Sequence, residues 1–202
     1  MAESDQEQIP LFPLGRPLYP GVNMKLRIFE QRYLNLVRNS MAAGTPFGIV
    51  PIIRGSEVGS APTFFHWGTL VEIVDFNQQP DGLLGITIQG NSRFRVRDSA
   101  VQGDGLVVAR VEHCEAVADK PLGQDEADLL HLLDDLVKGL QAEELFPDRE
   151  PTVAELSWRL ATLLPLPPSA KMALMQEGDG EIRLDIILEC LAGLSGSERT
   201  LN

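Results

Sequence analysis

Residues 9–33 read IPLFPLGRPLYPGVNMKLRIFEQRY and carry the most specific signal in the chain. Four prolines interrupt a run of large apolar side chains, although proline at this density usually marks a solvent-exposed linker or a polyproline ligand. The proline ring fixes φ at about −65° and removes a backbone donor, so proline suits strand edges and tight turns. We therefore expect the apolar residues to close one side of a barrel, with Pro20-Gly21 as a turn. The prolines are Pro10, Pro13, Pro17 and Pro20.

The rest of the first half predicts short strands around one helix. Residues 29–44 have helical apolar spacing through Tyr33, Val37 and Met41, and Gly44 supplies a stop. Ile28-Phe29, together with Tyr33, is expected to anchor this helix. Alternating apolar segments separated by turn residues predict antiparallel strands, and several such strands with one helix predict a closed or half-closed barrel. The expected strands cover residues 47–53, 68–76, 82–90, 92–98 and 105–117.

The second half differs in charge and in periodicity. Residues 1–118 contain 12 acidic and 10 basic residues, whereas residues 119–202 contain 17 acidic and 7 basic residues. An apolar stripe over 124–140 predicts an amphipathic helix with an acidic outer face. Thr152 and Glu155 form a capping box for a second helix, which Pro165 ends. Two further helices are expected, one capped by Ser169 and one capped by Asp179 and ending at Gly193.

These patterns predict an α+β protein with two subdomains. Residues 1–118 are expected to form the β-barrel subdomain, and residues 119–202 a helical bundle subdomain. No apolar run approaches the roughly 18–20 residues that span a bilayer, and the acidic N-terminus is unlike a secretory signal. Two cysteines give no disulfide framework. The sequence therefore predicts a cytoplasmic protein that does not enter membranes.

The sequence lacks the common motifs of nucleotide-binding and nucleophilic enzymes. The sequence has no Gly-x-x-x-x-Gly-Lys-Ser/Thr phosphate loop. Ser169 and Lys171 lie two residues apart, which places them on different faces of a helix and excludes a local Ser-Lys dyad. The tail GLSGS lacks the last glycine of a nucleophile elbow and follows a helix instead of a strand. We therefore expect no catalytic residues and no cofactor.

Two other clusters of polar residues lie on predicted helix and strand faces. His131 has Asp128 and Asp135 on the same helical face, but such a face is more often a solvated, ion-paired surface than a metal site, so no metal is predicted. A row of arginines along one strand could follow phosphates, although the net charge of −12 disfavours nucleic acid. This alternative nucleic-acid face consists of Arg93, Arg95 and Arg97.

Six segments follow one another in the order seen in one known family. They are IPLFPL (9–14), LYPG (18–21), LRIFEQRY (26–33), FGIV (47–50), GTLVEI (68–73) and GNSRFR (90–95). Together they resemble the Lon protease N-terminal, substrate-binding domain. Lys171 and the pair Arg183-Leu184 fit the family's later pattern more loosely, and Met24 stands where the family often has proline.

The resemblance implies a PUA-like pseudo-barrel of antiparallel strands with one helix, followed by a C-terminal helical bundle. It implies a stand-alone recognition module, lacking the ATPase and protease domains, that binds unfolded or exposed apolar protein segments in protein quality control. A separate ATPase or protease is a further expected partner. We expect the segments to bind in a cleft between barrel and bundle, where Arg32 contacts a carboxylate or carbonyl. The expected wall and rim residues are Phe12, Leu14, Arg32 and Tyr33.

A second reading of the resemblance stays open. Cereblon-type relatives of the family hold a small ligand, so the alternative function is a PUA-like small-molecule or RNA-binding protein. In that case the arginine row on the predicted strand 92–98 would carry the interaction.

Overall fold

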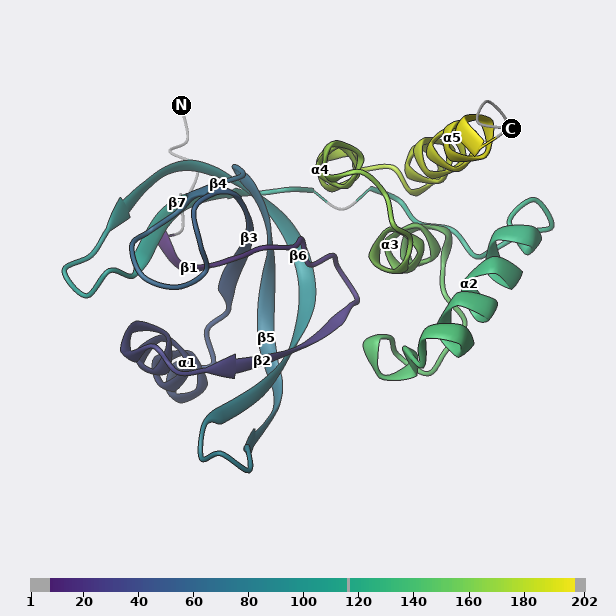
Figure 1. Ribbon diagram of the computed structural model, residues 1–202. Helices are drawn as coiled ribbons and strands as arrows, with labels where there is room; N and C mark the ends of the chain where they lie inside the picture. The colour runs from purple at the N-terminus through teal and green to yellow at the C-terminus, as the bar shows by residue number, and fades with distance from the viewer. Residues whose placement is uncertain (1–7, 116, 199–202) are drawn as a thin grey trace. The chain divides into compact units, whose positions relative to one another are not determined.

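The computed structural model describes residues 8–115 and 117–198 (Figure 1). The chain divides into two compact units between Cys114 and Glu115, whereas the sequence placed this boundary after residue 118. We call them the strand unit and the helical unit. Within the described residues, no helix is long and apolar enough to cross a membrane.

The strand unit contains the strands and the single helix that its sequence predicts. Two of the expected strands, 82–90 and 92–98, are corrected: one continuous strand runs from Leu84 to Val101, because Gly90 and Asn91 remain within it, and residues 82 and 83 belong to the preceding turn. The elements are β1 (Gln8–Leu14), β2 (Asn23–Ile28), α1 (Gln31–Ala43), β3 (Phe47–Arg54), β4 (Thr63–Phe64), β5 (Trp67–Gln78), β6 (Leu84–Val101) and β7 (Val107–His113).

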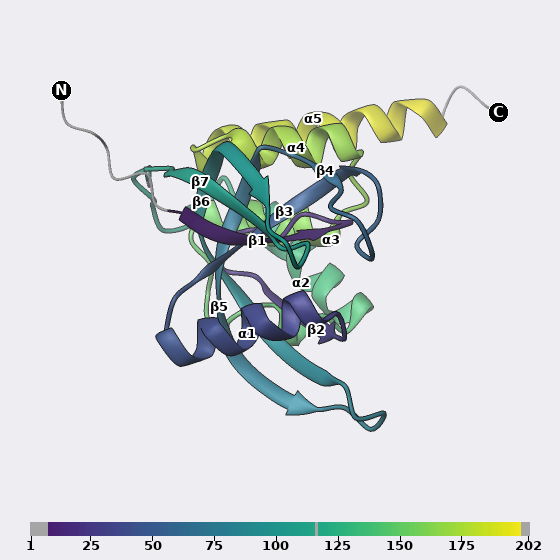
Figure 2. The same ribbon diagram turned by 90° about the vertical axis from the view of Figure 1, so that its left-hand side faces the viewer.

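The strand pairings close on themselves. The order along the sheet is β1-β7-β6-β5-β3-β4, and β1 also pairs with β3, so five strands form a ring. All pairs are antiparallel except β1 with β3, which is parallel and corrects the expectation of antiparallel strands alone. The chain between β1 and β3 holds β2 and α1, a crossover long enough for a parallel pair. β5 and β6 continue beyond the ring as a long hairpin (Figure 2).

The prolines of β1 lie inside the sheet without breaking it. β7 pairs with residues 8–11 and β3 pairs with residues 11–14, so each half of β1 has one open side. A proline whose nitrogen faces the open side removes no ladder hydrogen bond. The turn predicted at Pro20-Gly21 is confirmed, because Gly21 has φ 74° and its N–H donates to the Gly90 carbonyl at 2.8 Å.

The core of the strand unit forms where the strands approach closely at glycines. Gly48 and Gly68 face the ring of Phe94, which is fully buried. A Cβ atom added at Gly68 would lie 2.4 Å from the Ile49 carbonyl oxygen. The aromatic ring therefore occupies space that side chains at these positions would fill. The buried cluster consists of Ile9, Leu11, Val50, Phe64, Leu70, Phe94, Val96, Val107, Ala109 and Val111.

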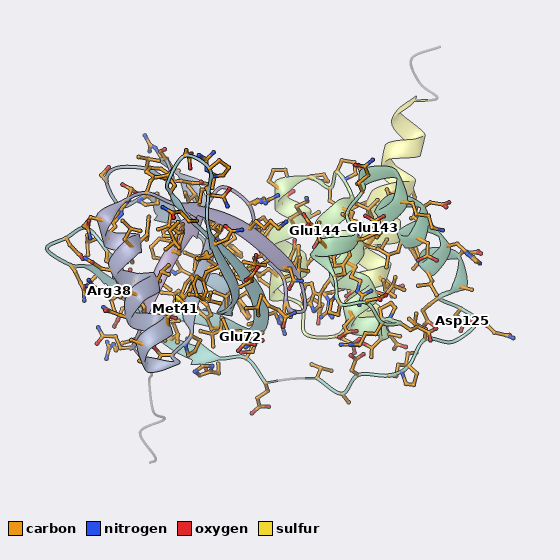
Figure 3. All side chains as sticks on the ribbon, turned by 90° about the horizontal axis from the view of Figure 1, so that it is seen from below. Arg38, Met41, Glu72, Asp125, Glu143 and Glu144 are labelled. Carbon is orange, nitrogen blue, oxygen red and sulfur yellow. The ribbon has the colours of Figure 1, made fainter. Side chains whose placement is uncertain are left out.

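Helix α1 buries one face, as its spacing predicts, but two apolar residues depart from the prediction. The C-cap Gly44 adopts φ 64°, which confirms the predicted stop. Met41, expected on the buried stripe, is 44% exposed and lies on the outer surface near Arg38 (Figure 3). Phe29, expected to anchor the helix, is 55% exposed. The buried face consists of Arg32, Tyr33, Leu36, Val37 and Ser40.

The helical unit contains four α-helices and one 3-10 helix within the described residues. The capping box of Thr152 and Glu155 is confirmed. The helix Pro168–Gln176 has Pro167 as its N-cap, where Ser169 was expected. The last helix was expected to end at Gly193, but it continues to Glu198. α3 packs against α2 and α5, and α4 packs against α5. The elements are α2 (Ala127–Leu140), η1 (Glu143–Leu145), α3 (Val153–Leu163), α4 (Pro168–Gln176) and α5 (Gly180–Glu198).

A buried arginine joins α5 to α3. Arg183 is 1% exposed, and its Nε donates to Ser157 Oγ at 2.8 Å. Its Nη1 donates to the carbonyl oxygens of Glu177 and Gly178, and its guanidinium lies 3.7 Å from the centre of the Trp158 ring. Satisfying the donors in this way makes burial of the charge tolerable.

Candidate functional site

The strand unit has a cavity of about 330 Å³, which we call the β2–α1 pocket. Its floor comes from the end of β1, and one wall from β2 and the turn that leads into α1. A residue of α1 and the loop after β3 complete it. The lining residues are Phe12, Leu14, Lys25, Leu26, Arg27, Ile28, Phe29, Glu30, Tyr33, Glu57 and Val58.

Three of the four residues predicted for peptide binding meet in this pocket. Phe12 and Leu14 come from β1 and Tyr33 from the first turn of α1. The rings of Phe12 and Tyr33 stack with their centroids 3.9 Å apart and an interplanar angle of 16°. All three side chains are buried, so they form a preformed apolar floor. Whether this floor binds peptide stays a prediction.

Arg32 is the fourth predicted residue, and it does not line the pocket. Its Nη1 donates to the Gly105 carbonyl and its Nη2 to Glu30 Oε2, each at 2.9 Å. The guanidinium lies 4.7 Å from the centre of the Tyr33 ring, and within the described chain the buried Nε has no hydrogen-bond partner. With two nitrogens already engaged, Arg32 is placed to fix Tyr33 and Glu30 and does not face the pocket.

The loop between β3 and β4 forms part of the rim. The Gly15 N–H donates to Glu57 Oε1 at 2.6 Å, and the Gly59 N–H donates to Glu30 Oε1 at 3.2 Å. These bonds hold Val58 at the pocket although its side chain is 52% exposed. Val58 therefore adds an exposed apolar group above the buried floor.

The sequence did not predict that the rim of the pocket contains two exposed apolar residues, Phe29 and Val58. Phe29 precedes α1, where helical spacing suggested an anchor for the helix, yet it lines the pocket and is 55% exposed. Val58 is a single branched apolar residue in a loop of small and polar residues, and this contrast is the only signal that the sequence offers for it.

Charged and polar groups border the apolar floor of the pocket. The pKa of Tyr33 is raised, mainly because the phenol is buried. The carboxylates of Glu30 and Glu57 add to this rise and the Arg32 guanidinium opposes it, so the phenol stays neutral near neutral pH. Arg27 pairs with Asp81. Among the described residues that line the pocket there is no serine, cysteine or histidine. The site therefore offers apolar surface bordered by hydrogen-bonding and charged groups.

The arginines of the alternative nucleic-acid face lie where the alternation predicts. Arg93, Arg95 and Arg97 alternate along β6 with buried Phe94 and Val96. Acidic groups interrupt the row, because Arg97 pairs with Glu112 of β7 and Asp98 pairs with Arg110. A phosphate backbone would therefore meet carboxylates as well as guanidinium groups on this face.

The predicted acidic face around His131 lies on α2, where Asp128, His131 and Asp135 are exposed. Across the parts of the chain that the structure describes, no group of three or more histidine, cysteine or carboxylate side chains is placed to hold a metal ion. Cys114 and Cys190 are both free thiols.

The comparison with protein families matches residues 8–193 to the ATP-dependent protease La (LON) substrate-binding domain. The Lon protease of Paraburkholderia phytofirmans is 30% identical over 205 residues, which cover 93% of this chain and 24% of that protein. Protein cereblon of Danio rerio is 26% identical over 114 residues, which cover 54% of this chain and 26% of that protein. The chain thus spans about a quarter of the length of these relatives.

A solved structure extends the similarity to three dimensions. The crystal structure of a Lon N-terminal domain protein from Xanthomonas campestris superposes with a TM-score of 0.71 and 36% sequence identity. The match covers 91% of this chain and 98% of that chain. The mixed helix and sheet fold, with its mainly antiparallel sheet, is therefore similar to a known fold over almost its whole length.

Proposed function

Because the chain belongs to the family of the ATP-dependent protease La (Lon) substrate-binding domain, we propose that it is a non-catalytic recognition module for unfolded protein segments. The ring of strands would act as a PUA-like pseudo-barrel, and the helical unit as the bundle that follows it. The binding site is the β2–α1 pocket, and the ligand is a segment that presents a large apolar side chain.

The observation that carries the proposal is the combination of a buried aromatic floor with an exposed apolar rim. Phe12 and Tyr33 are stacked and already ordered, so binding costs them little conformational entropy. Phe29 and Val58 expose apolar surface that a bound side chain would cover. The cavity of about 330 Å³ lies near the lower end of ligand-pocket volumes, which favours one large side chain over an extended segment.

The affinity expected from such a site is modest. A short apolar contact must offset the ordering of a flexible segment, so a dissociation constant of the order of micromolar is expected for one site. Weak binding of this kind suits a module that samples many unfolded chains. A separate ATPase or protease would then act on the captured chain, as the family's name suggests.

The test compares two exposed phenylalanines. Phe29 lines the pocket and is 55% exposed, whereas Phe76 on β5 is 59% exposed and does not line it. Each is replaced by alanine, and binding of a fluorescently labelled, permanently unfolded casein is followed by anisotropy. We expect Phe29→Ala to weaken binding about 5- to 20-fold, which corresponds to about 1–2 kcal/mol, and Phe76→Ala to have no effect.

Both substitutions are at exposed positions, so the thermal unfolding of each variant should stay close to that of the parent protein. Equal weakening by the two substitutions would indicate nonspecific contact with exposed aromatic groups. That result, or the absence of any binding to the parent protein, would refute the proposal.

The alternative RNA-binding function is tested with the same assay and a single-stranded RNA at low salt. A basic face requires net positive charge to retain RNA, and here Glu112 and Asp98 interrupt the row of arginines. The alternative requires binding that is lost when Arg95 and Arg97 are replaced by glutamate. We expect the RNA not to be retained.

A further inference from the structure

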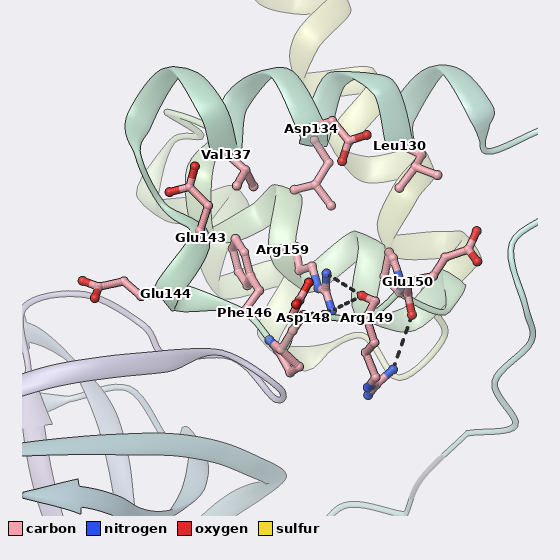
Figure 4. A pocket seen from close by; sticks show the side chains of 13 residues that line it. Leu130, Asp134, Val137, Glu143, Glu144, Phe146, Asp148, Arg149, Glu150 and Arg159 are labelled. Carbon is pink, nitrogen blue, oxygen red and sulfur yellow. Dashed lines mark hydrogen bonds between the residues drawn. The ribbon is translucent and has the colours of Figure 1, made fainter.

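The helical unit has a hollow of its own, with a volume of about 860 Å³, which we call the α2 groove. One side is helix α2, and the other is the segment that runs from η1 to α3 (Figure 4). The lining residues are Leu130, Leu133, Asp134, Val137, Glu143, Glu144, Phe146, Pro147, Asp148, Arg149, Glu150, Pro151 and Arg159. The groove shares no lining residue with the β2–α1 pocket.

The floor of the α2 groove is apolar. Leu130, Leu133 and Val137 lie three and four residues apart on α2, which puts them on one face of the helix. Leu130 and Val137 point from α2 toward the opposite side, where Phe146 lies (Figure 4). Leu133 and Phe146 are buried, whereas Leu130 and Val137 are only half-buried, so part of the floor remains open to a ligand.

The two arginines of the groove are already engaged in holding its wall. Arg159 donates to the carbonyl oxygens of Pro147 and Arg149 at 3.3–3.4 Å, and its guanidinium lies 5.4 Å from the centre of the Phe146 ring. Arg149 makes a two-pronged ion pair with Glu155, which lies on α3 outside the lining. The segment between η1 and α3 is therefore fixed, and neither arginine neutralises the rim.

The rim of the groove is rich in acidic residues. Five exposed carboxylates stand around the floor, with Glu143 and Glu144 at one end and Glu150 toward the other (Figure 4). In the described part of the chain, Asp134, Glu143, Asp148 and Glu150 form no ion pair. An apolar floor bordered by these four carboxylates presents an apolar surface and a negatively charged surface side by side.

We propose that the α2 groove binds a basic amphipathic helix of a partner protein, with its apolar face on the floor and lysine or arginine side chains against the rim. A helix in a groove is held by apolar anchors spaced three and four residues apart, and the floor residues of α2 have the same spacing. Charge complementarity selects a basic partner, because an acidic segment would meet like charges on both sides of the groove. The interaction is independent of peptide capture in the strand unit.

The test uses three synthetic helical peptides of roughly 18 residues, about five turns. One has a leucine face and a lysine face, one replaces leucine by serine, and one replaces lysine by glutamate. Fluorescence anisotropy at about 150 mM salt, where long-range attraction is largely screened, measures the binding of each. We expect the leucine–lysine peptide to bind at least about tenfold more tightly than either of the others, because it alone satisfies both floor and rim.

Matched charge reversals test whether the groove is the site. Asp134→Lys with Glu143→Lys alters the rim, whereas Asp135→Lys with Glu189→Lys makes the same change in net charge at exposed positions outside the groove. We expect the first pair to weaken binding of the leucine–lysine peptide at least about tenfold and the second about twofold or less. Phe29→Ala should leave this binding unchanged, since Phe29 belongs to the β2–α1 pocket.

Equal weakening by the two charge reversals would assign the binding to long-range attraction and overturn the proposal. So would leucine–lysine binding no tighter than serine–lysine binding, or the absence of binding. If circular dichroism shows that the rim reversal does not fold, Asp134→Asn with Glu143→Gln replaces it. This neutral pair should weaken binding about threefold or more, and an unchanged affinity would also overturn the proposal.

Discussion

Gly68 shows how much of the strand unit depends on single atoms. Its Cα passes so close to β3 that an added methyl group would lie 2.4 Å from the Ile49 carbonyl oxygen and 2.5 Å from Phe94 Cζ. Backbone cannot move aside without disturbing the pairing of β5 with β3. A glycine in the segment GTLVEI is therefore required by packing, independently of any turn.

We predict that Gly68→Ala destabilises the protein by about 3 kcal/mol or more, because the methyl group overpacks a fixed site. Gly139 in α2 provides the control, since nothing lies within 4 Å of a Cβ added there. Gly139→Ala should stabilise the protein by about 0.5–1 kcal/mol through helix propensity. Urea denaturation followed by circular dichroism measures both. Similar effects of the two substitutions would contradict the packing argument.

At the scale of elements, periodicity predicted most helices and strands but not their contacts. The strand pattern placed Arg93, Arg95 and Arg97 on the outer face of β6, because alternation assigns faces directly. The pattern did not reveal that β1 lies parallel to β3, because the choice of pairing partner depends on the tertiary fold and not on the alternation within one strand. The helical pattern likewise indicated a helix near Asp179, but not that Arg183 is its buried anchor.

The prediction at this scale concerns the contribution of the buried Arg183 contacts to stability. Arg183→Lys should destabilise the protein by about 2–3 kcal/mol. One ammonium group cannot donate at the same time to Ser157 Oγ and to the carbonyl oxygens of Glu177 and Gly178. It also lacks the planar surface with which the guanidinium stacks on the Trp158 ring. Arg149→Lys is the control, since the Arg149 side chain is 56% exposed, its partner Glu155 is half-buried and lysine keeps the charge. This substitution should change stability by less than about 1 kcal/mol.

The measurement is the midpoint of urea unfolding at constant slope for the two arginine variants. Equal midpoints for Arg183→Lys and the parent protein would show that the buried contacts contribute no net stability. A reduced slope would instead show that the variant no longer unfolds as the parent does.

At the scale of the whole molecule, the sequence predicted the distribution of charge better than the sites. The excess of acidic residues after residue 118 is visible by counting. The α2 groove was not predictable, because residues 143–151 have no periodic pattern and become a wall only by folding back against α2. Phe12, Leu14 and Tyr33 were predicted as binding residues through family resemblance, but only the fold shows that they line one cavity.

The two tyrosines give the molecule a defined response to alkali. Burial raises the pKa of Tyr19 and of Tyr33 above the ordinary value of 10.0, and the chain has no other tyrosine. The unfolded chain then loses phenolic protons at a lower pH than the folded protein does. The stability from keeping these phenols protonated is full below about pH 10 and is lost as the pH rises toward the folded pKa.

We predict that the free energy of unfolding falls above about pH 10, by about 1.4 kcal/mol per pH unit for Tyr19 alone. Tyrosinate absorbance and circular dichroism are recorded together from about pH 8 to about pH 12, with N-acetyltyrosinamide as the reference. Tyrosinate should appear later than in the reference and together with unfolding. Tyr19→Phe should make the alkaline decline shallower, whatever it does to stability near neutral pH. Ionisation of both tyrosines near pH 10 in a protein that remains folded would contradict their burial.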